Sequence, residues 1–405
     1  MNRVKEKIVN WDFFNKIVLL YVTGSPGLIK LLIVLFASKL LEAPDSASFS
    51  INFSILIALS IFTSIGFSTQ IMKVSATSLG PEKEFYPYLL YSVVTSLVIL
   101  FFFVAISFLS ESIEVAWAFF ILVISYYNCV KSYYIARRKF YKAAFLEITI
   151  ILLFIMQIIF FYLFEMISAK YFVTATILSY LAAIVYTPIK KREPSHFCFN
   201  NYLIGVKAGF SNLMSSGIVY LLPYFSSIGG SANLVLSITI SSYVLGIASV
   251  FPRAYLNKNI KIISSSIDQR LKSEISRACL IKAEKKCAKI AFLSAACSFF
   301  SSIFLLYLAG GVLTVSACMA VFLGALFMFS AQAFVVSSFV MLVTNKINLA
   351  IIVNFLIFVV FIITMYGLRM LGMDGTVAYF CSLALLCVLY FVRGYVFQLG
   401  AYGRG

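Results

Sequence analysis

The stretch from Ile17 to Leu40 reads IVLLYVTGSPGLIKLLIVLFASKL, and it decides the fold class of this chain. It is apolar over slightly more than the roughly 20 residues that an α-helix needs to cross the hydrocarbon core of a bilayer. It is too long for the apolar core of a secretory signal peptide, and it has no convincing small-residue cleavage site. We therefore interpret it as a first membrane span that is retained.

The composition of the whole chain agrees with a lipid environment. Hydrophobic residues make up 62% of the 405 residues and charged residues only 12%, which does not suit a soluble surface. The net charge of +17 is concentrated in short stretches beside apolar runs, unlike the continuous basic face of a nucleic-acid-binding protein. The eight cysteines predict no disulfide framework. The chain is predicted to be an all-α polytopic membrane protein that does not bind nucleic acid.

Further apolar runs predict about twelve spans in two sets of six. The first set lies near 17–38, 48–70, 87–109, 114–135, 144–164 and 171–189, and the second near 203–225, 232–252, 289–308, 313–342, 348–368 and 374–392. LEAPDSASFSI, from Leu41, aligns weakly with IGGSANLVLSI, from Ile228, and each follows the first span of its set. We expect an N-terminal lobe over 1–200 and a C-terminal lobe over 201–405, as in transporters built from parallel repeats.

The distribution of basic residues predicts the orientation. Most of the 32 Lys and Arg residues fall between spans on one face, whereas the opposite face has only Lys39, Lys170 and Arg369. Because cytoplasmic loops carry the excess of Lys and Arg, both termini are predicted to be cytoplasmic.

One cytoplasmic segment, about 253–288, is long enough for structure of its own. It has an apolar residue at every fourth position, which indicates an amphipathic helix: Ile263, Ile267, Leu271, Ile275 and Cys279. We interpret it as a linker helix lying against anionic lipid headgroups. A regulatory or partner-binding role is the alternative.

Lys30 lies inside the first span. It follows the helix-breaking stretch Gly24-Ser25-Pro26-Gly27 and lies about 20 Å beyond Ile17 at ~1.5 Å per residue, which is near the middle of the bilayer. A lysine facing lipid at that depth costs about 3 kcal/mol or more. We expect Lys30, with Thr23 on the same helical face, to line a substrate cavity. A buried ion pair or a misplaced span boundary is the alternative.

A second lysine, Lys207, lies nearer the cytoplasmic end of its span. It shares one polar face of the seventh span with Ser211 and Ser215, and it either lines the cavity or reaches the headgroups. Small polar residues such as Ser60 and Thr63 in the second span indicate first close helix packing and second a shared hydrated cavity.

Glu147 begins the fifth span about one turn beyond Lys142, so we expect a local ion pair between them. A titratable carboxylate used for proton coupling is the sharper alternative. Signals of an enzyme are missing: the single histidine, His196, lies beside Cys198 without the partners of a metal site or a nucleophile. We predict no catalytic residues, no metal and no cofactor.

Several stretches resemble the Wzx-type O-antigen flippases, the polysaccharide-transporter branch of the multidrug/oligosaccharidyl-lipid/polysaccharide (MOP) exporter superfamily. They are the first-span exit ASKLLEAPDSASF, IGFSTQIMKVSA after the second span, the basic loop YYIARRKFYKAAFLEI and the late stretch LGMDGTVAYFCSLALL. The first-span exit has Glu42-Ala43-Pro44 where Gly-Pro is usual in that family.

The resemblance implies two six-helix lobes of the MATE/MOP type in the bacterial inner membrane. It implies a flippase that moves an undecaprenyl-diphosphate-linked oligosaccharide to the periplasmic leaflet by alternating access, among membrane lipids and other membrane proteins of polysaccharide assembly. The resemblance would also explain why Lys30 and Lys207 lie inside spans, since cations solvate a diphosphate.

Three other functions compete with this expectation. A cation-coupled exporter of drugs with the same fold should place carboxylates in the first or seventh span, where this chain has lysines. A lipid II flippase relative typically has two further spans. A membrane glycan polymerase or glycosyltransferase should show a catalytic constellation.

Overall fold

The computed structural model describes residues 2–77, 81–110, 115–188, 198–227, 232–268, 274–308, 314–344 and 346–402, and every regular element within them is a helix. The first half consists of α1 (Asn2–Leu40), α2 (Ala43–Ser60), the π-helical turn η1 (Ile61–Ile65), α3 (Gly66–Thr77), α4 (Pro81–Ser110), α5 (Val115–Ala136), α6 (Phe140–Leu163), α7 (Ala169–Tyr180) and the 3₁₀ turn η2 (Leu181–Ile184).

The second half has the same general plan. It consists of α8 (Phe199–Asn212), the π-helical turn η3 (Leu213–Gly217), α9 (Ile218–Ser227), α10 (Ala232–Ala248), α11 (Val250–Asp268), α12 (Glu274–Leu308), α13 (Val315–Gln332), α14 (Val335–Val343), α15 (Ile347–Met370) and α16 (Gly375–Tyr402).

The prediction of an all-helical protein with about twelve spans is confirmed, because each expected segment coincides with one helix or with consecutive helices. Eight of these stretches are long and apolar enough to cross a membrane on length and composition. The other four expected spans correspond to α5, α7, α8–α9 and α10–α11. Of these, α8–α9 contains the π turn η3, and α10–α11 breaks at Ser249 because Pro252 has no N–H for the carbonyl of Ala248.

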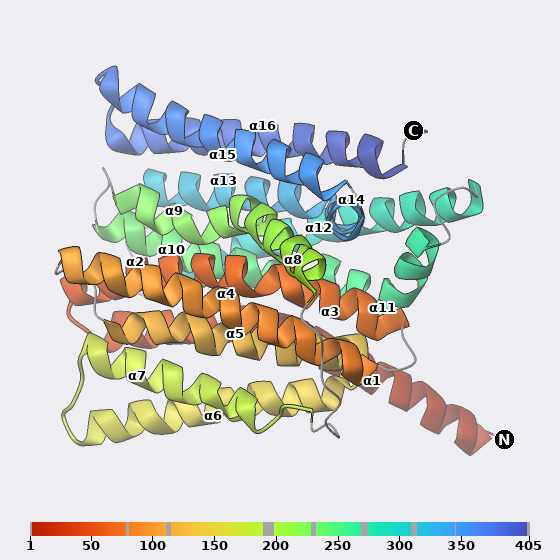
Figure 1. Ribbon diagram of the computed structural model, residues 1–405. Coiled ribbons are helices and arrows are strands. Elements are labelled where there is room, and N and C mark those ends of the chain that lie inside the picture. Colours follow the sequence, from red (N-terminus) through yellow and green to blue (C-terminus); the bar gives the residue numbers. More distant parts are fainter. Residues whose placement is uncertain are drawn as a thin grey trace.

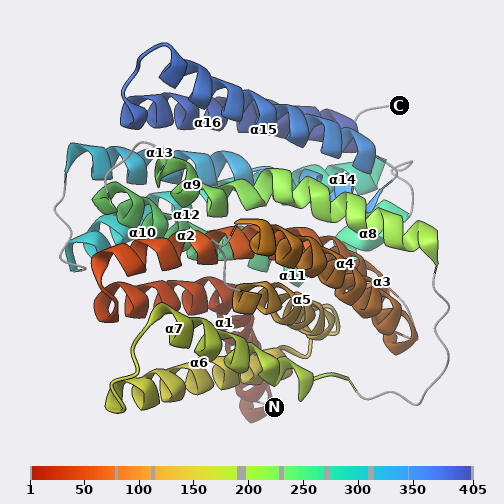
Figure 2. The same ribbon diagram turned by 60° about the vertical axis from the view of Figure 1, so that its left-hand side comes forward.

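The helices lie side by side, with α1 to α7 in the lower part of Figure 1 and α15 and α16 at the top. The start of α1 and the end of α16 lie at the same end of the bundle, which we call the terminal end (Figure 1). The opposite end, which we call the far end, carries the connections α1–α2, α6–α7 and α15–α16. Figure 2 shows the same layering after rotation.

The two halves contact each other reciprocally. The first span of the first half, α1, packs against α10 in the second span of the second half, and α2 packs against α9 in the seventh span. Such an exchange is expected of two similarly built lobes related by an axis through the membrane.

Glycines allow one of these contacts to be very close. A Cβ atom on Gly66 of α3 would lie 2.0 Å from the carbonyl oxygen of Gly205, and one on Gly209 would lie 2.1 Å from that of Phe62. Gly205 and Gly209 form a Gly-x-x-x-Gly pattern on α8, the arrangement that lets two membrane helices approach backbone to backbone. The second and seventh spans therefore touch directly on the terminal-end side of η1.

The outside of the bundle carries large apolar side chains. Phe101 of α4 is 71% exposed, Met156 of α6 66% and Phe300 of α12 69%, whereas aromatic residues such as Tyr91 and Phe120 are buried between helices. A surface of this kind suits lipid as solvent.

The expected linker helix over 253–288 differs from the structure. Helix α11 ends at Asp268 and α12 begins at Glu274, while Leu271 lies outside the described residues. Ile263 is buried with Leu280 and Val336 in a cluster that joins α11, α12 and α14. Ile263 of the expected apolar face is therefore covered by protein and not by headgroups, while the side chains of Ile267, Leu271 and Ile275 lie outside the described residues.

Candidate functional site

A cavity of about 330 Å³ is lined by helices from both halves of the chain, which we call the first lobe (α1 to α7) and the second lobe (α8 to α16). Lys30 of α1 marks its deep part near the middle of the bundle, and Met72, Asn257 and Leu342 line it close to the terminal end. Helices from both lobes form its wall, with α1 and α5 on one side and α11, α14 and α16 on the other.

The wall begins at an irregular part of α1. Pro26 lies inside this helix and cannot donate a hydrogen bond to the carbonyl of Val22, so the Ser25 hydroxyl donates to that carbonyl instead, at 3.3 Å. A Cβ atom on Gly27 would lie only 3.0 Å from Ile247 of α10, so α1 lies tightly against the other lobe here. Lys30 comes one turn later.

Lys30 is half-buried, and its ammonium lies 4.8 Å from the centre of the Tyr220 ring, from α9. This cation–π contact crosses between the lobes. No carboxylate among the described residues lies within ion-pair distance of Lys30.

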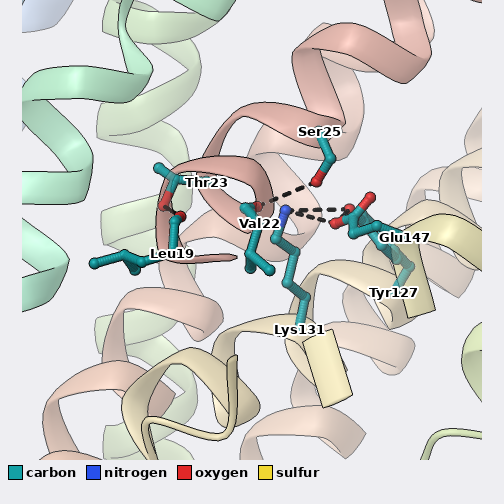
Figure 3. A network of polar contacts seen from close by, with 7 residues as sticks. All are labelled: Leu19, Val22, Thr23, Ser25, Tyr127, Lys131 and Glu147. Carbon is teal, nitrogen blue, oxygen red and sulfur yellow. Dashed lines mark hydrogen bonds and ion pairs between the residues drawn. The ribbon is translucent and has the colours of Figure 1, made fainter. Parts of the chain in front are cut away.

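A second lysine, Lys131 of α5, is also in the cavity wall and is 6% exposed. Its Nζ atom lies 2.6 Å from Oε1 of Glu147 on α6, and the Tyr127 hydroxyl donates to the same carboxylate oxygen. Figure 3 shows this network beside Ser25 on α1. Glu147 is fully buried, and its other oxygen, Oε2, has no hydrogen-bond partner among the described residues.

The prediction that Glu147 pairs with Lys142 is therefore wrong. Glu147 lies on the buried side of α6 and faces α5, whereas Lys142 is exposed and its ammonium lies 5.9 Å from the Tyr134 ring. Lys131 stands only five residues before the end of α5, beside the basic stretch YYIARRKFYKAAFLEI, and the sequence did not single it out as a partner of Glu147. The carboxylate pairs across helices because the buried side of α6 turns it toward α5.

Two arginines of the second lobe complete the charged wall, and sequence reasoning assigned both to the cytoplasmic face. Arg253 of α11 is half-buried and lines the cavity. Arg393 of α16 also lines it and is 7% exposed. Nine helical residues follow Arg393, ending with Tyr402, about 14 Å of helix, and this continuation of the apolar pattern was the signal that could have placed it inside.

The predicted site residues divide into two groups. Thr23, Lys30 and Ser215 line the cavity, whereas Lys207 and Ser211 are not among the described residues that line it. Lys207 is half-buried on α8, and Ser211 is fully buried, where its hydroxyl accepts a hydrogen bond from Asn354 at 2.8 Å.

The cavity is strongly cationic. Lys131 is neutralised by Glu147, while Lys30, Arg253 and Arg393 have no carboxylate within ion-pair distance among the described residues. Three cations therefore remain without an anionic partner in one cavity. Groups of three or more metal-binding side chains are not found in the described part of the chain.

Toward the far end the lobes are closed against each other. The hydroxyls of Ser54 on α2 and Tyr243 on α10 are 3.0 Å apart, and the Tyr243 ring lies against those of Phe53 and Tyr220. The lining of the cavity thus extends to the terminal end. On the side of the far end, the cavity is closed by these aromatic contacts.

No protein-family model matches this chain, and no curated protein matches it in sequence. Solved structures do. A MATE transporter in complex with MaD5 has a TM-score of 0.64 at 15% identity, with 96% of each chain covered. The eukaryotic MATE transporter AtDTX14 has a TM-score of 0.67 at 11% identity, covering 95% of this chain and 97% of that one.

A third similar structure is a MOP superfamily transporter from Pyrococcus furiosus, whose reverse polarity of the binding pocket suggests a different function for it. Its TM-score is 0.61 at 14% identity, with 96% of this chain and 95% of that chain covered. Sequence identities this low show a shared arrangement of helices and do not indicate a shared substrate. The chain is a multi-pass membrane protein with the fold of the MATE transporters of the MOP superfamily.

Proposed function

We propose that this protein is a flippase that moves an undecaprenyl-diphosphate-linked oligosaccharide from the cytoplasmic to the periplasmic leaflet of a bacterial inner membrane. The observation that carries the proposal is the cavity between the lobes with three cations that have no anionic partner among the described residues: Lys30, Arg253 and Arg393. The terminal end, at which the cavity wall ends, would face the cytoplasm, in keeping with the excess of basic residues there.

A diphosphate needs cations once it leaves water. Each of its phosphate groups is ionised, and charge-assisted hydrogen bonds from Lys and Arg replace the lost hydration. Conversely, a buried cation without a partner, such as Arg393, costs several kcal/mol, and the half-buried Lys30 and Arg253 add to the positive charge, so the cavity is suited to an anionic ligand. The volume, about 330 Å³, falls in the range of roughly 300–1,000 Å³ usual for small-ligand sites. It suits the headgroup, with the prenyl chain left in lipid.

Glu147 is the coupling group in this proposal. If the carboxylate takes up a proton, Lys131 loses its counter-ion and becomes a fourth cation in the cavity wall. Binding of an anion at Lys131 and protonation of Glu147 would then favour each other, which links substrate binding to proton uptake.

An exporter of small molecules with the same fold is the second candidate. The observation in its favour is the same carboxylate, because Glu147 is buried beside the bend of α1, where a cation could replace a proton. The two candidates differ in cargo, since an exporter of cationic drugs would have to bring them past three unpaired cations.

The test uses purified protein in vesicles with a fluorescent prenyl-diphosphate sugar. Lys30→Ala is expected to lower transbilayer movement at least about tenfold, because one charge-assisted contact is lost. Lys30→Arg should keep most of it. The matched control is Lys39→Ala, an exposed lysine at the far end of the same helix.

In cells, deletion of the gene should leave lipid-linked repeat units facing the cytoplasm, and Lys30→Ala should fail to restore surface glycan. Full restoration at normal protein level would refute the role of Lys30. Drug accumulation in the deletion strain, with normal lipid-linked sugars, would favour the exporter.

A further inference from the structure

Arg393 is a buried arginine in the cavity wall that the diphosphate does not account for. It projects from α16, is 7% exposed, and has no carboxylate within ion-pair distance among the described residues. Its Nε atom is buried without a hydrogen-bond partner among those residues. A cation in this state needs an anion that arrives from outside the protein.

The guanidinium group is held in one orientation. Its carbon lies 4.9 Å from the centre of the Tyr390 ring and 4.7 Å from that of Phe397, residues one turn before and one turn after it on α16. One terminal nitrogen lies 3.5 Å from the Ser338 hydroxyl on α14. The aromatic contacts restrict the group and leave Nε as an unused donor.

The backbone around Arg393 is equally fixed. A Cβ atom on Gly394 would lie 2.0 Å from the Phe334 ring, so α16 is pressed against the break between α13 and α14. The Tyr390 hydroxyl donates to the carbonyl of Ser215 at 2.7 Å, which ties the same turn of α16 to η3. The donors of Arg393 are therefore positioned before any ligand binds, as recognition of an oxyanion by two donors requires.

Neighbouring groups are of the kind that bind sugars. The side-chain carbonyls of Gln332 on α13 and Asn354 on α15 are buried without hydrogen-bond partners among the described residues, and both residues line the cavity. They can accept from hydroxyl groups. The rings of Tyr390 and Phe397 add apolar surface beside them.

On the basis of the proposed function, the negative charges of the ligand can be compared with the positive charges of the cavity. A diphosphate that carries a prenyl chain at one end and a sugar at the other has two ionised oxygens near neutral pH. Lys30 and Arg253 provide two positive charges, and Lys131 is already neutralised by Glu147. Arg393 remains as one positive charge on the second-lobe side.

We infer that Arg393 forms a separate oxyanion subsite for the glycan, which binds the carboxylate of an acidic sugar through Nε and a terminal nitrogen. Gln332 and Asn354 accept from hydroxyl groups of the same sugar. The cargo class is thus a prenyl-diphosphate oligosaccharide with at least one uronic or similarly carboxylated residue.

The test compares three soluble ligands by calorimetry on purified protein. They are farnesyl diphosphate, a farnesyl-diphosphate-linked disaccharide with glucose as its second sugar, and the same disaccharide with glucuronate there. The wild-type protein should bind the glucuronate ligand about 10- to 100-fold more tightly than the glucose ligand, the usual gain from one charge-assisted pair.

Arg393→Gln should abolish that preference and leave the affinity for the glucose ligand, whose diphosphate is esterified at both ends, unchanged, whereas Lys30→Gln should weaken all three ligands. Arg393→Lys, which keeps the charge but lacks the second nitrogen, should retain only part of the preference. Arg137→Gln, an exposed arginine between α5 and α6, is the matched control and should behave as wild type. Thermal unfolding of each variant checks that it is folded.

Different failures have different meanings. If farnesyl diphosphate does not bind to the wild type, the proposed function itself is refuted. If farnesyl diphosphate binds through Lys30 but glucuronate and glucose ligands bind equally, the subsite is refuted and the flippase stands. If Arg393→Gln weakens the glucose ligand as much as the glucuronate ligand, Arg393 serves the diphosphate and the subsite for an acidic sugar is again refuted.

Discussion

Glu147 meets Lys131 at a point where three helices of the first lobe come together. The carboxylate projects from α6, its partner from α5, and both lie beside Ser25 at the bend of α1 (Figure 3). Two opposite charges that are both buried contribute little net stability as a pair, but each is costly alone. The pair therefore fixes which face of α6 turns inward.

This predicts unequal effects of three substitutions. Lys131→Met and Glu147→Gln each leave one buried charged or polar partner unmatched and should destabilise the protein by about 3–5 kcal/mol. The double variant should recover much of that loss. Lys142→Met removes an exposed lysine with only a distant ring contact and should cost less than about 1 kcal/mol. Unfolding of the purified variants in detergent measures these differences.

The same variants also measure the coupling between ligand binding and proton uptake. Binding of farnesyl diphosphate to the wild type should take up a proton, which calorimetry in buffers of different ionisation enthalpy detects, and Glu147→Gln should show no uptake. Unchanged proton uptake in that variant would remove Glu147 from the coupling. Additive losses in the double variant would show that the two side chains do not form a pair.

At the scale of helices, two π-helical turns shape the contact between the second and seventh spans. A π turn leaves backbone carbonyls without a helical partner, and here side chains from other helices bond to them. The Ser92 hydroxyl donates to the carbonyl of Thr63 in η1, and Tyr390 donates to that of Ser215 in η3. Ser60 and Ser215 line the cavity near these turns, while Thr63 is buried against Ser125. Of the two interpretations of the small polar residues, close helix packing thus applies to Thr63 and cavity lining to Ser60 and Ser215.

The closeness of this crossing predicts the effect of a single methyl group. Gly209→Ala would place Cβ 2.1 Å from the carbonyl oxygen of Phe62, a backbone atom that cannot turn away, so the two spans must separate. We expect a loss of about 1–3 kcal/mol, as for other overpacked sites. The control is Gly367→Ala on α15, where no atom lies within 4 Å of the added Cβ. It should be neutral or gain up to about 1 kcal/mol, because alanine favours a helix.

Melting temperatures of the two glycine variants, measured side by side in the same detergent, make this comparison. Equal behaviour of Gly209→Ala and Gly367→Ala would mean that the crossing is looser in the membrane than the structure shows.

Over the whole molecule, the cavity wall reaches the terminal end while aromatic contacts between Tyr243, Phe53 and Tyr220 close the lobes toward the far end. A transporter that works by alternating access must break these contacts and close the terminal end in turn. The halves are joined by side-chain contacts and by the close glycine crossing, so the proposed flippase would exchange its two states most simply by rigid-body rocking about that crossing.

The orientation predicts which side of the membrane reaches the cavity. In a variant whose native cysteines are replaced by alanine, Ser249→Cys in the cavity wall should react with a membrane-impermeant maleimide applied from the cytoplasmic side. Ser168→Cys, between α6 and α7 at the far end, should react from the periplasmic side. Inside-out and right-side-out vesicles provide the two tests. Labelling of both residues from one side would contradict the orientation or the state shown here.

The sequence by itself determined the all-helical fold, the approximate twelve spans and the need of Lys30 for a polar environment inside its span. In lipid a backbone must satisfy its hydrogen bonds within each span, so the length of an apolar run carries most of the information about the fold. Lys30 stood far from either end of such a run, and its depth alone required a polar environment.

Only the tertiary structure decided which charged residues share the cavity. Arg253 and Arg393 come directly after predicted spans and Lys131 lies near the end of one, so the sequence did not place them in a cavity. Lys207, which it did, is not among the described residues that line the cavity. Whether such a side chain reaches water, lipid or a cavity depends on the rotation of its helix and on what packs against it. Those quantities are set by contacts between residues far apart in the chain, such as Lys131 with Glu147 and Tyr390 with Ser215.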